Sequence, residues 1–196
     1  MNIEHLILFP TLVKKFNKFL TEEECKKIVS NLDKFEFNTH PLITGNSSSA
    51  HKGYYEAVFV LNTIDKDIFP INDRLFQQIT IYGEELGIVN LGINNSWINI
   101  QGPGSNLKVH CHPLSAISGA LYLKVDNQSS GLMFVHPNPQ LDMVKVDTYT
   151  AFSSKTVEIK PSIGDLILFP SWLKHGSDIT NMSEQRVVLS FNTGFL

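Results

Sequence analysis

Two histidines separated by one residue constrain this chain more strongly than any other feature of its sequence. His110 and His112 flank a single cysteine, a third histidine, His175, lies 63 residues after His112, and Arg186 follows 11 residues later. In an extended strand, residues i and i+2 point to the same side of the sheet. The pair therefore predicts a strand that turns two imidazoles to one side, within a β framework that brings His175 to the same place.

The three histidines are candidate metal ligands. Neutral imidazole is the commonest metal-ligating side chain in proteins. Three protein ligands on one face of an octahedron leave positions open for small molecules, as in non-heme Fe(II) sites. Turn-forming residues, Gly104 before the pair and Gly164 before His175, favour strands that present these side chains. We predict a metal site formed by His110, His112 and His175, and ordinary surface or core roles for the other histidines, His5, His40, His51 and His136.

The second half of the chain has a residue pattern that is typical of β proteins. From Ile93 onward, short runs rich in Val, Ile, Leu and Phe are separated by clusters of Gly, Pro, Asn and Ser. An excursion of loop and short strand is expected over residues 137–154. We predict strands near residues 93–101, 106–112, 116–125, 131–135, 155–160, 164–169 and 185–193.

The first half is expected to supply helices. Thr21 and Glu24 have the spacing of a capping box, which predicts a helix that begins after Thr21. A second helix is expected after Pro70, an edge strand over residues 3–13, and a mobile loop over 44–49.

The length of 196 residues suits one domain rather than two. The predicted fold class is mainly β with flanking helices (α+β). A helical support region, residues 1–90, is expected to buttress a double-stranded β-helix, a jelly-roll or cupin-like barrel, over residues 91–196.

Composition narrows the partners and the compartment. The formal net charge of -3 and the scattered Lys and Arg give no electrostatic case for nucleic acid or an anionic membrane as a partner. No apolar run reaches the ~18–20 residues of a membrane span, and the first residues lack the features of a signal peptide. Only two cysteines, Cys25 and Cys111, are present, which favours a reducing, cytoplasmic setting over a disulfide framework. The sequence leaves open whether the protein is a monomer or a homodimer.

The stretch around Arg186 alternates between polar and apolar positions. Arg186 and Ser190 fall on the same strand face as Val188 and Asn192, whereas Val187 and its period-two neighbours form an apolar face. An arginine turned into a barrel is costly unless it meets an anion, and its planar fork suits a carboxylate. The alternative for Arg186 is a surface ion pair with Glu184 or Asp178.

Three motifs are shared with a known enzyme family. They are His110-x-His112-Pro113, Ser118-Gly119-x-x-Tyr122 and Phe169-Pro170-Ser171-x-x-x-His175. With them, the stretch from Trp97 to Asn192 resembles the 2-oxoglutarate- and Fe(II)-dependent oxygenases of the prolyl-hydroxylase-like type. The resemblance is strongest to an uncharacterised branch with a His-x-His-Pro motif. It covers about half of the chain directly.

The resemblance assigns the metal ligands residue by residue. His110 matches the first iron ligand of the family and His175 the last, while His112 stands where most members have Asp or Glu. Either His112 binds the metal or a water molecule takes that position, and we favour ligation. A neutral imidazole in place of a carboxylate removes one negative charge from the metal's ligands. The implied metal is Fe(II).

The resemblance also implies the cosubstrates, 2-oxoglutarate and O2, and a reaction that hydroxylates a substrate and releases succinate and CO2. Arg186 would bind the distal carboxylate of 2-oxoglutarate, and Ser190 would add a hydrogen bond. Asn99 and Tyr122, on neighbouring strands, are candidates for further contacts. The substrate, a small molecule or a peptidyl side chain, is not readable from the sequence. Its binding surface is expected to include Trp97, Trp172 and the 44–53 loop with His51.

Two other classes fit part of the pattern. A cupin-type metal dioxygenase, which needs no 2-oxoglutarate, shares the glycine before the pair and the glycine-containing turn before the last histidine. It would also need a glutamate three or four residues after the pair, where Ser115, Ala116 and Ile117 stand. The second alternative is a metal-binding barrel without catalytic activity.

Overall fold

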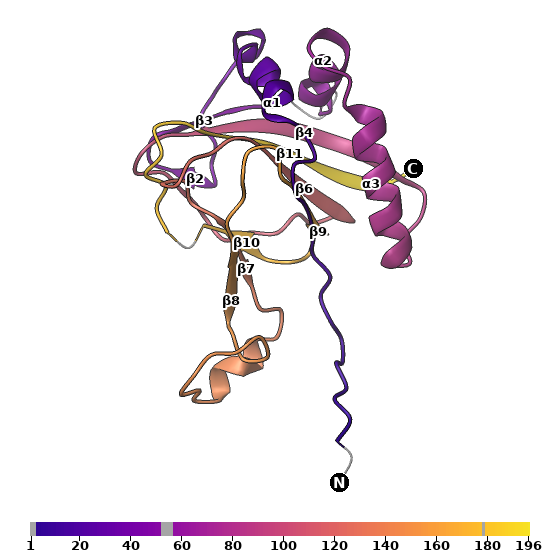
Figure 1. The fold of residues 1–196 in the computed structure, drawn as a ribbon, viewed down its shortest axis with the longest axis vertical. Coiled ribbons are helices and arrows are strands. Elements are labelled where there is room, and N and C mark those ends of the chain that lie inside the picture. The colour runs from indigo at the N-terminus through magenta and orange to yellow at the C-terminus, as the bar shows by residue number, and fades with distance from the viewer. Residues whose placement is uncertain (1–2, 52–56, 178) are drawn as a thin grey trace.

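The computed structural model describes residues 3–51, 57–177 and 179–196. Its centre is a six-stranded antiparallel sheet with the strand order β1-β9-β6-β11-β4-β3 (Figure 1). The two longest strands, β4 and β11, lie side by side in this sheet. The bounds are β1 Lys14–Phe16, β3 Ser47–Ala50, β4 Leu91–Gln101, β6 Ile117–Lys124, β9 Leu166–Pro170 and β11 Arg186–Phe195.

One face of this sheet carries the main hydrophobic core. Val187, Leu189 and Phe191 of β11 are fully buried on this face, because successive side chains of a strand point to opposite sides. They belong to the same core cluster as residues of three helices, α1 Glu22–Val29, α2 Phe59–Asp67 and α3 Asn72–Glu85. Figure 1 shows these helices on one side of the sheet.

The opposite face of the sheet meets a smaller set of strands. A three-stranded sheet has the order β10-β7-β8, and β2 pairs with β5. A second core cluster joins Tyr122 and Val188 of the large sheet to Leu132 and Phe134 of β7. The bounds are β2 Ile43–Thr44, β5 Asn106–Leu107, β7 Leu132–Val135, β8 Thr156–Ile159 and β10 His175–Gly176. Two facing sheets with helices packed outside confirm the predicted fold class.

Most elements agree with the sequence prediction. The helix that begins after Thr21 is capped as expected: the Glu24 amide donates to Thr21 Oγ1 at 3.2 Å, and the Thr21 amide donates to Glu24 Oε2 at 2.7 Å. The helix expected after Pro70 is α3. Within the described residues, no helix is both long and apolar enough to span a lipid bilayer.

Several local predictions were wrong. The expected edge strand over 3–13 is absent: β1 begins at Lys14 and pairs through only three residues with β9, and the apolar residues before it are exposed. The expected loop over 44–49 instead contains part of β3, whose serines pair with β4. This strand forms through backbone hydrogen bonds, which do not depend on the side chains. Its serine-rich composition therefore did not indicate a strand. The strand expected over 106–112 ends at Leu107. Residues 137–154 hold a 3-10 helix, η3 Pro139–Met143, rather than a strand.

The helix α2 was not predicted from the sequence. This helix has Val58 at its N-cap position and no side-chain capping hydrogen bond, so the usual start signal is missing. The N-terminal part of the chain, which was expected to be a helical support, also contributes β1 and β3 to the large sheet.

A tight turn joins the N-terminal part to the sheet just before β9. Gly164 has φ of +84° and donates its amide to the Tyr122 carbonyl at 2.7 Å, and its own carbonyl accepts from the Leu20 amide at 3.1 Å. A Cβ atom at this position would lie 2.0 Å from the Leu20 carbonyl oxygen. Both the backbone conformation and the close approach therefore require glycine.

Replacement of Gly164 by alanine is expected to destabilise the protein more than the same change at Gly87. Gly87 also has positive φ, +71°, but a Cβ atom added there would have nothing within 4 Å, so Gly87→Ala should cost only the strain of about 1–2 kcal/mol. Gly164→Ala should have the same strain and, in addition, lose about 1–3 kcal/mol of the free energy of unfolding through the clash with Leu20. Urea unfolding of the two variants measures the difference, and equal losses would contradict this account of the turn.

Candidate metal centre

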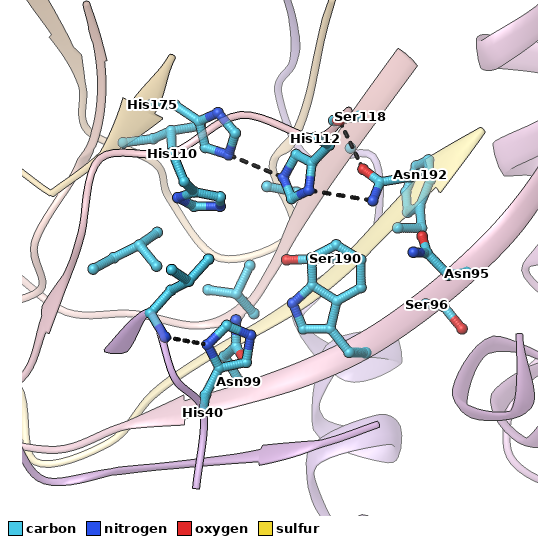
Figure 2. A pocket seen from close by; sticks show the side chains of 18 of the residues that line it. His40, Asn95, Ser96, Asn99, His110, His112, Ser118, His175, Ser190 and Asn192 are labelled. Atoms are coloured by element: carbon cyan, nitrogen blue, oxygen red, sulfur yellow. Dashed lines mark hydrogen bonds between the residues drawn. The ribbon is translucent and has the colours of Figure 1, made fainter. Parts of the chain in front are cut away.

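The structure brings His110, His112 and His175 together. One ligand nitrogen from each lies within 4.8 Å of the others. The ring centroids are 4.9 Å apart for His110 and His112, 4.3 Å for His110 and His175, and 5.0 Å for His112 and His175. Figure 2 shows the three rings facing one another at one end of a pocket. Among the described residues, this is the one group of three or more His, Cys, Asp or Glu side chains close enough to hold a metal ion.

Backbone pairing fixes the positions of the three rings. His110 and His175 form an isolated antiparallel bridge, in which each amide donates to the carbonyl of the other at 2.9 Å, and the His112 amide donates to the Ser171 carbonyl at 2.9 Å. Gly176 lets the chain approach closely, because a Cβ there would lie 2.8 Å from the Leu107 carbonyl oxygen. The distant histidine is thus fixed against the pair by main-chain bonds.

Hydrogen bonds on Nδ1 orient two of the rings. His110 Nδ1 lies 2.8 Å from the Lys108 carbonyl, and His175 Nδ1 lies 2.9 Å from the Leu173 carbonyl. A carbonyl only accepts, so each Nδ1 carries the proton and each Nε2 has a free lone pair. His112 Nε2 lies 3.2 Å from His175 Nε2. One nitrogen of each ring therefore points to the same place.

Burial keeps the three rings neutral near pH 7. Desolvation lowers the pKa of His112 to about 3, helped by the nearby His175 and His110, and lowers the pKa of His175 to about 4. Desolvation also lowers the pKa of His110. Because a metal binds the neutral imidazole, the metal does not have to displace protons from these rings at neutral pH.

A cavity of about 300 Å³ extends from the histidines across the open face of the large sheet. The polar side of β11 lines it with Arg186, Ser190 and Asn192, as the alternation of that strand predicts. Opposite them on β4, Asn99 pairs with Val188 and Trp97 with Ser190. Tyr122 of β6 also lines the cavity, so all seven predicted site residues share one space.

Arg186 is a buried cation at the end of the cavity away from the metal ligands. It is 4% exposed. Its Nε donates to the Ser130 carbonyl at 3.1 Å, its Nη1 donates to Gln101 Oε1, and its guanidinium carbon lies 5.3 Å from the centroid of the Tyr122 ring. No carboxylate in residues 3–51, 57–177 or 179–196 forms an ion pair with it. The expected alternative partner Glu184 is exposed, and Asp178 lies outside the described residues.

Two buried polar atoms of residues that line the cavity have no hydrogen-bond partner within the described part of the chain. They are Asn99 Oδ1 and the Tyr122 hydroxyl. Burial raises the pKa of Tyr122 against the opposing charge of Arg186, so the hydroxyl keeps a proton that it can donate. A buried cation and an unpaired donor are costly in an empty apolar site. Arg186 and the Tyr122 hydroxyl, both donors, fit an anion that carries carboxylate oxygens, whereas Asn99 Oδ1 can only accept.

A comparison with known families agrees with this arrangement. A family model with the description "Putative 2OG-Fe(II) oxygenase", where 2OG stands for 2-oxoglutarate, matches residues 95–192, which are 98 of the 196 residues. The match includes all seven predicted site residues.

The chain belongs to this 2OG-Fe(II) oxygenase family.

Solved structures of similar fold include other 2OG-Fe(II) oxygenases. HygX from Streptomyces hygroscopicus, with nickel and 2-oxoglutarate bound, aligns with a TM-score of 0.65 and 13% identity over 94% of this chain and 83% of HygX. A prolyl-4-hydroxylase from Pseudomonas putida aligns with a TM-score of 0.63 and 14% identity over 95% and 94% of the two chains. The viral collagen prolyl hydroxylase of Paramecium Bursaria Chlorella virus-1 aligns with a TM-score of 0.59 and 15% identity over 94% of this chain and 96% of the hydroxylase. No curated protein matches the chain in sequence.

Family membership confirms the predicted resemblance, the oxygenase class, and Fe(II) and 2-oxoglutarate as the cofactor and cosubstrate of the family. The donor set of this 2OG-Fe(II) oxygenase fits the metal, since imidazole nitrogens suit iron. The unpaired Arg186 fits an anionic cosubstrate.

The cavity contains some of the residues expected at the substrate surface, and that surface stays a prediction. Trp97 and His51 line the cavity, whereas Trp172 lies 56% exposed beside a separate hollow near η3. Part of the loop expected to cover the site, residues 52–53, lies outside the described residues.

Two features of the cavity were missed from the sequence. His40 was assigned an ordinary role, yet it lines the cavity, with its Nδ1 accepting from the Leu42 amide at 3.2 Å (Figure 2). Asn192 was placed on the polar face of β11, but its contact with His112 was not foreseen. No local pattern marks either contact, because each joins residues far apart in the chain.

The neutral histidines make the metal-free protein sensitive to acid. The pKa values of His112 and His175 are lower in the folded protein than the ordinary 6.5, so the unfolded chain binds more protons below that pH. The free energy of unfolding should therefore fall as the pH drops from about 6.5 towards 4, by at most about 1.4 kcal/mol per pH unit for each histidine. Urea unfolding in EDTA at several pH values measures this slope.

His112→Gln is the test variant, because it removes one of these groups and should flatten the pH dependence. The matched control is His5→Gln, which changes an exposed histidine outside the cavity. Identical pH dependences for His112→Gln and the parent protein would show that His112 does not contribute to the loss of stability at low pH.

Proposed function

We propose that this protein is an Fe(II)- and 2-oxoglutarate-dependent dioxygenase that hydroxylates its substrate, with His110, His112 and His175 as the metal ligands. We propose further that Arg186 binds the distal carboxylate of 2-oxoglutarate. One observation carries the proposal: a cluster of three neutral imidazoles and a buried arginine without a carboxylate partner in the described residues line a single cavity.

Each side chain has a part that follows from its position. Bound Fe(II) supplies open coordination positions at which 2-oxoglutarate and O2 can react. The three imidazoles would hold the metal, and a backbone bridge and Nδ1 bonds fix the directions of His110 and His175. Arg186 orients the cosubstrate through a charge-assisted pair. Ser190, the Tyr122 hydroxyl and Asn99 offer further hydrogen-bonding groups along the same path.

Aromatic rings pack against two of the candidate metal ligands. The Phe169 ring lies 4.6 Å from the His175 ring, and the Trp97 ring lies 5.7 Å from the His112 ring. Exclusion of water strengthens the electrostatic interactions within the site. No side chain has to act as a general base in this proposal.

The cupin alternative is the weaker one. The position where a cupin has its glutamate is occupied by Ser115 to Ile117, and the matching family model is that of the 2OG-Fe(II) oxygenases. The non-catalytic barrel differs from the enzyme only in turnover, so it is separated by the experiment below.

The substrate is a small molecule or a peptidyl group. Similar solved folds act on different molecules: a HygX structure holds hygromycin B, and two others are prolyl hydroxylases. We propose a cytoplasmic setting on the basis of two unpaired cysteines, Cys25 and Cys111, and we propose no nucleic-acid or membrane partner. A homodimer remains an open alternative for the assembly.

The Fe(II)-loaded protein should convert 2-oxoglutarate slowly to succinate even without its substrate. This turnover should require O2, increase with ascorbate and stop with N-oxalylglycine. His110→Ala and His175→Ala should abolish it, and the exposed His5→Gln should not, because His5 lies outside the cavity. Succinate is measured by chromatography.

The other outcomes separate the alternatives. Succinate that stays at the metal-free background across amino acids, prolyl peptides and small metabolites would identify a non-catalytic barrel. Metal-dependent O2 consumption that needs no 2-oxoglutarate would identify a cupin-type enzyme.

Arg186→Leu should weaken 2-oxoglutarate binding to the metal-loaded protein about ten- to hundredfold, because a charge-assisted hydrogen bond contributes roughly 1.5–3 kcal/mol. Arg186→Lys should recover only part of the affinity, since a point charge cannot form the bidentate pair. Anaerobic calorimetry measures both. The chain has one other arginine, Arg74, which pairs with Glu24 at 3.0 Å outside the cavity, so Arg74→Lys is the control. Unchanged affinity in Arg186→Leu would remove Arg186 from the cosubstrate site.

A further inference from the structure

His112 is oriented differently from the other two candidate ligands. His110 and His175 each have a main-chain carbonyl at Nδ1, which fixes the proton there. His112 Nδ1 instead lies 3.4 Å from the side-chain amide nitrogen of Asn192. An amide side chain has both a donor and an acceptor end, so the tautomer of His112 depends on which end faces the ring.

Asn192 belongs to a buried polar network that joins three elements. It is 3% exposed on β11 and lies directly opposite Ser118 of β6. Its Oδ1 accepts from Ser118 Oγ at 2.7 Å, and Ser118 Oγ lies 2.8 Å from Ser171 Oγ, where either hydroxyl can donate. The Ser171 carbonyl in turn accepts from the His112 amide. Figure 2 shows Ser118, Asn192 and His112 in one chain of hydrogen bonds.

The observed hydrogen bonds of His112 define one tautomer of its ring. The amide nitrogen of Asn192 faces His112 Nδ1, so Nδ1 is the acceptor and the ring proton is on Nε2. That Nε2–H can donate to His175 Nε2 at 3.2 Å, whose lone pair is free because His175 carries its proton on Nδ1. In this state the two nitrogens that would bind a metal share a hydrogen bond instead.

Coordination requires the other tautomer. If His112 Nε2 binds a metal, its proton must be on Nδ1 and must find an acceptor. A half-turn of the Asn192 amide presents Oδ1 to that proton and its nitrogen to Ser118 Oγ. The Ser118–Ser171 hydroxyl pair can reverse its direction to match, since either oxygen can donate. The network therefore serves both states with its heavy atoms in nearly the same places.

We propose that Asn192, backed by Ser118 and Ser171, is a positioning residue. Its Oδ1 accepts a hydrogen bond from the Nδ1–H of His112 and so makes His112 a metal ligand. This inference rests on the proposed three-histidine metal site. It explains how an imidazole can take a place that usually holds a carboxylate: the ring needs a proton acceptor behind it, and Asn192 provides one. Groups behind a metal ligand that fix its tautomer typically change metal affinity about 10–100-fold when removed.

The test is the affinity of the metal-free protein for Co(II), measured by calorimetry without 2-oxoglutarate. Asn192→Leu keeps the size of the side chain and removes the acceptor, so it should weaken binding about 10–100-fold. Asn192→Asp supplies an acceptor that needs no half-turn, so it should bind at least as tightly as the parent. This rescue would not follow from a merely structural role.

Asn95 provides matched controls for size and charge. It lies opposite Asn192 on β4 and lines the same cavity, and its buried Oδ1 has no hydrogen-bond partner among the residues that the structure describes. Asn95→Leu and Asn95→Asp should change Co(II) affinity less than the corresponding changes at Asn192. An equal gain from both aspartates would show a general effect of negative charge and would overturn the proposal.

A measurement on the unmodified protein keeps the proposal falsifiable if Asn192→Leu does not fold. Nitrogen-15 NMR of the histidine rings should show His112 protonated on Nε2 without metal and on Nδ1 with Zn(II). An unchanged tautomer, or parent-like Co(II) affinity in Asn192→Leu, would overturn the inference while leaving the metal site in place. Failure of the proposed function is distinct, because the parent would then bind no Co(II) or would bind it as tightly after His110→Ala.

Discussion

The pairing of β11 with β4 on one side and β6 on the other is the constraint on which the site depends. This pairing fixes the register of β11, and a shift of one residue would exchange its two faces. On one face, Val187, Leu189 and Phe191 are buried under the helices. On the other, Arg186 and Asn192 point into the cavity. The apolar core thus fixes the register, and the register places the polar groups that line the cavity.

Charge is distributed unevenly in this cavity. Among the described residues that line it, none is Asp or Glu, Arg186 is cationic, and burial keeps the three candidate metal ligands neutral. A divalent metal bound here would receive no negative charge from its protein ligands. A dianion such as 2-oxoglutarate would offset two of the three positive charges that the metal and Arg186 carry together. The affinities for metal and cosubstrate should therefore be coupled, each raising the other by the same factor.

Local sequence signals predicted much of the fold and the main parts of the site. The capping box at Thr21, the alternation that starts at Arg186 and the spacing of His110 and His112 each express a short-range rule, and each has the expected structural form. Features that depend on distant partners were not predictable. The β3 serines form a strand because β4 lies beside them, and His40 lines the cavity although its neighbours in sequence give no sign of it.

The candidate ligand His112 illustrates the same limit at the level of chemistry. A carboxylate only accepts hydrogen bonds once ionised, whereas a ligating imidazole has one N–H left over that must be paired when buried. A ligating His112 therefore requires a second residue that accepts a hydrogen bond from this N–H. Asn192 lies where the N–H would point. The His-x-His spacing is visible in the sequence, but the partner that makes the second histidine usable comes from a strand 80 residues away. The candidate metal ligand and the residue that positions it thus come from different parts of the chain, and only the fold brings them together.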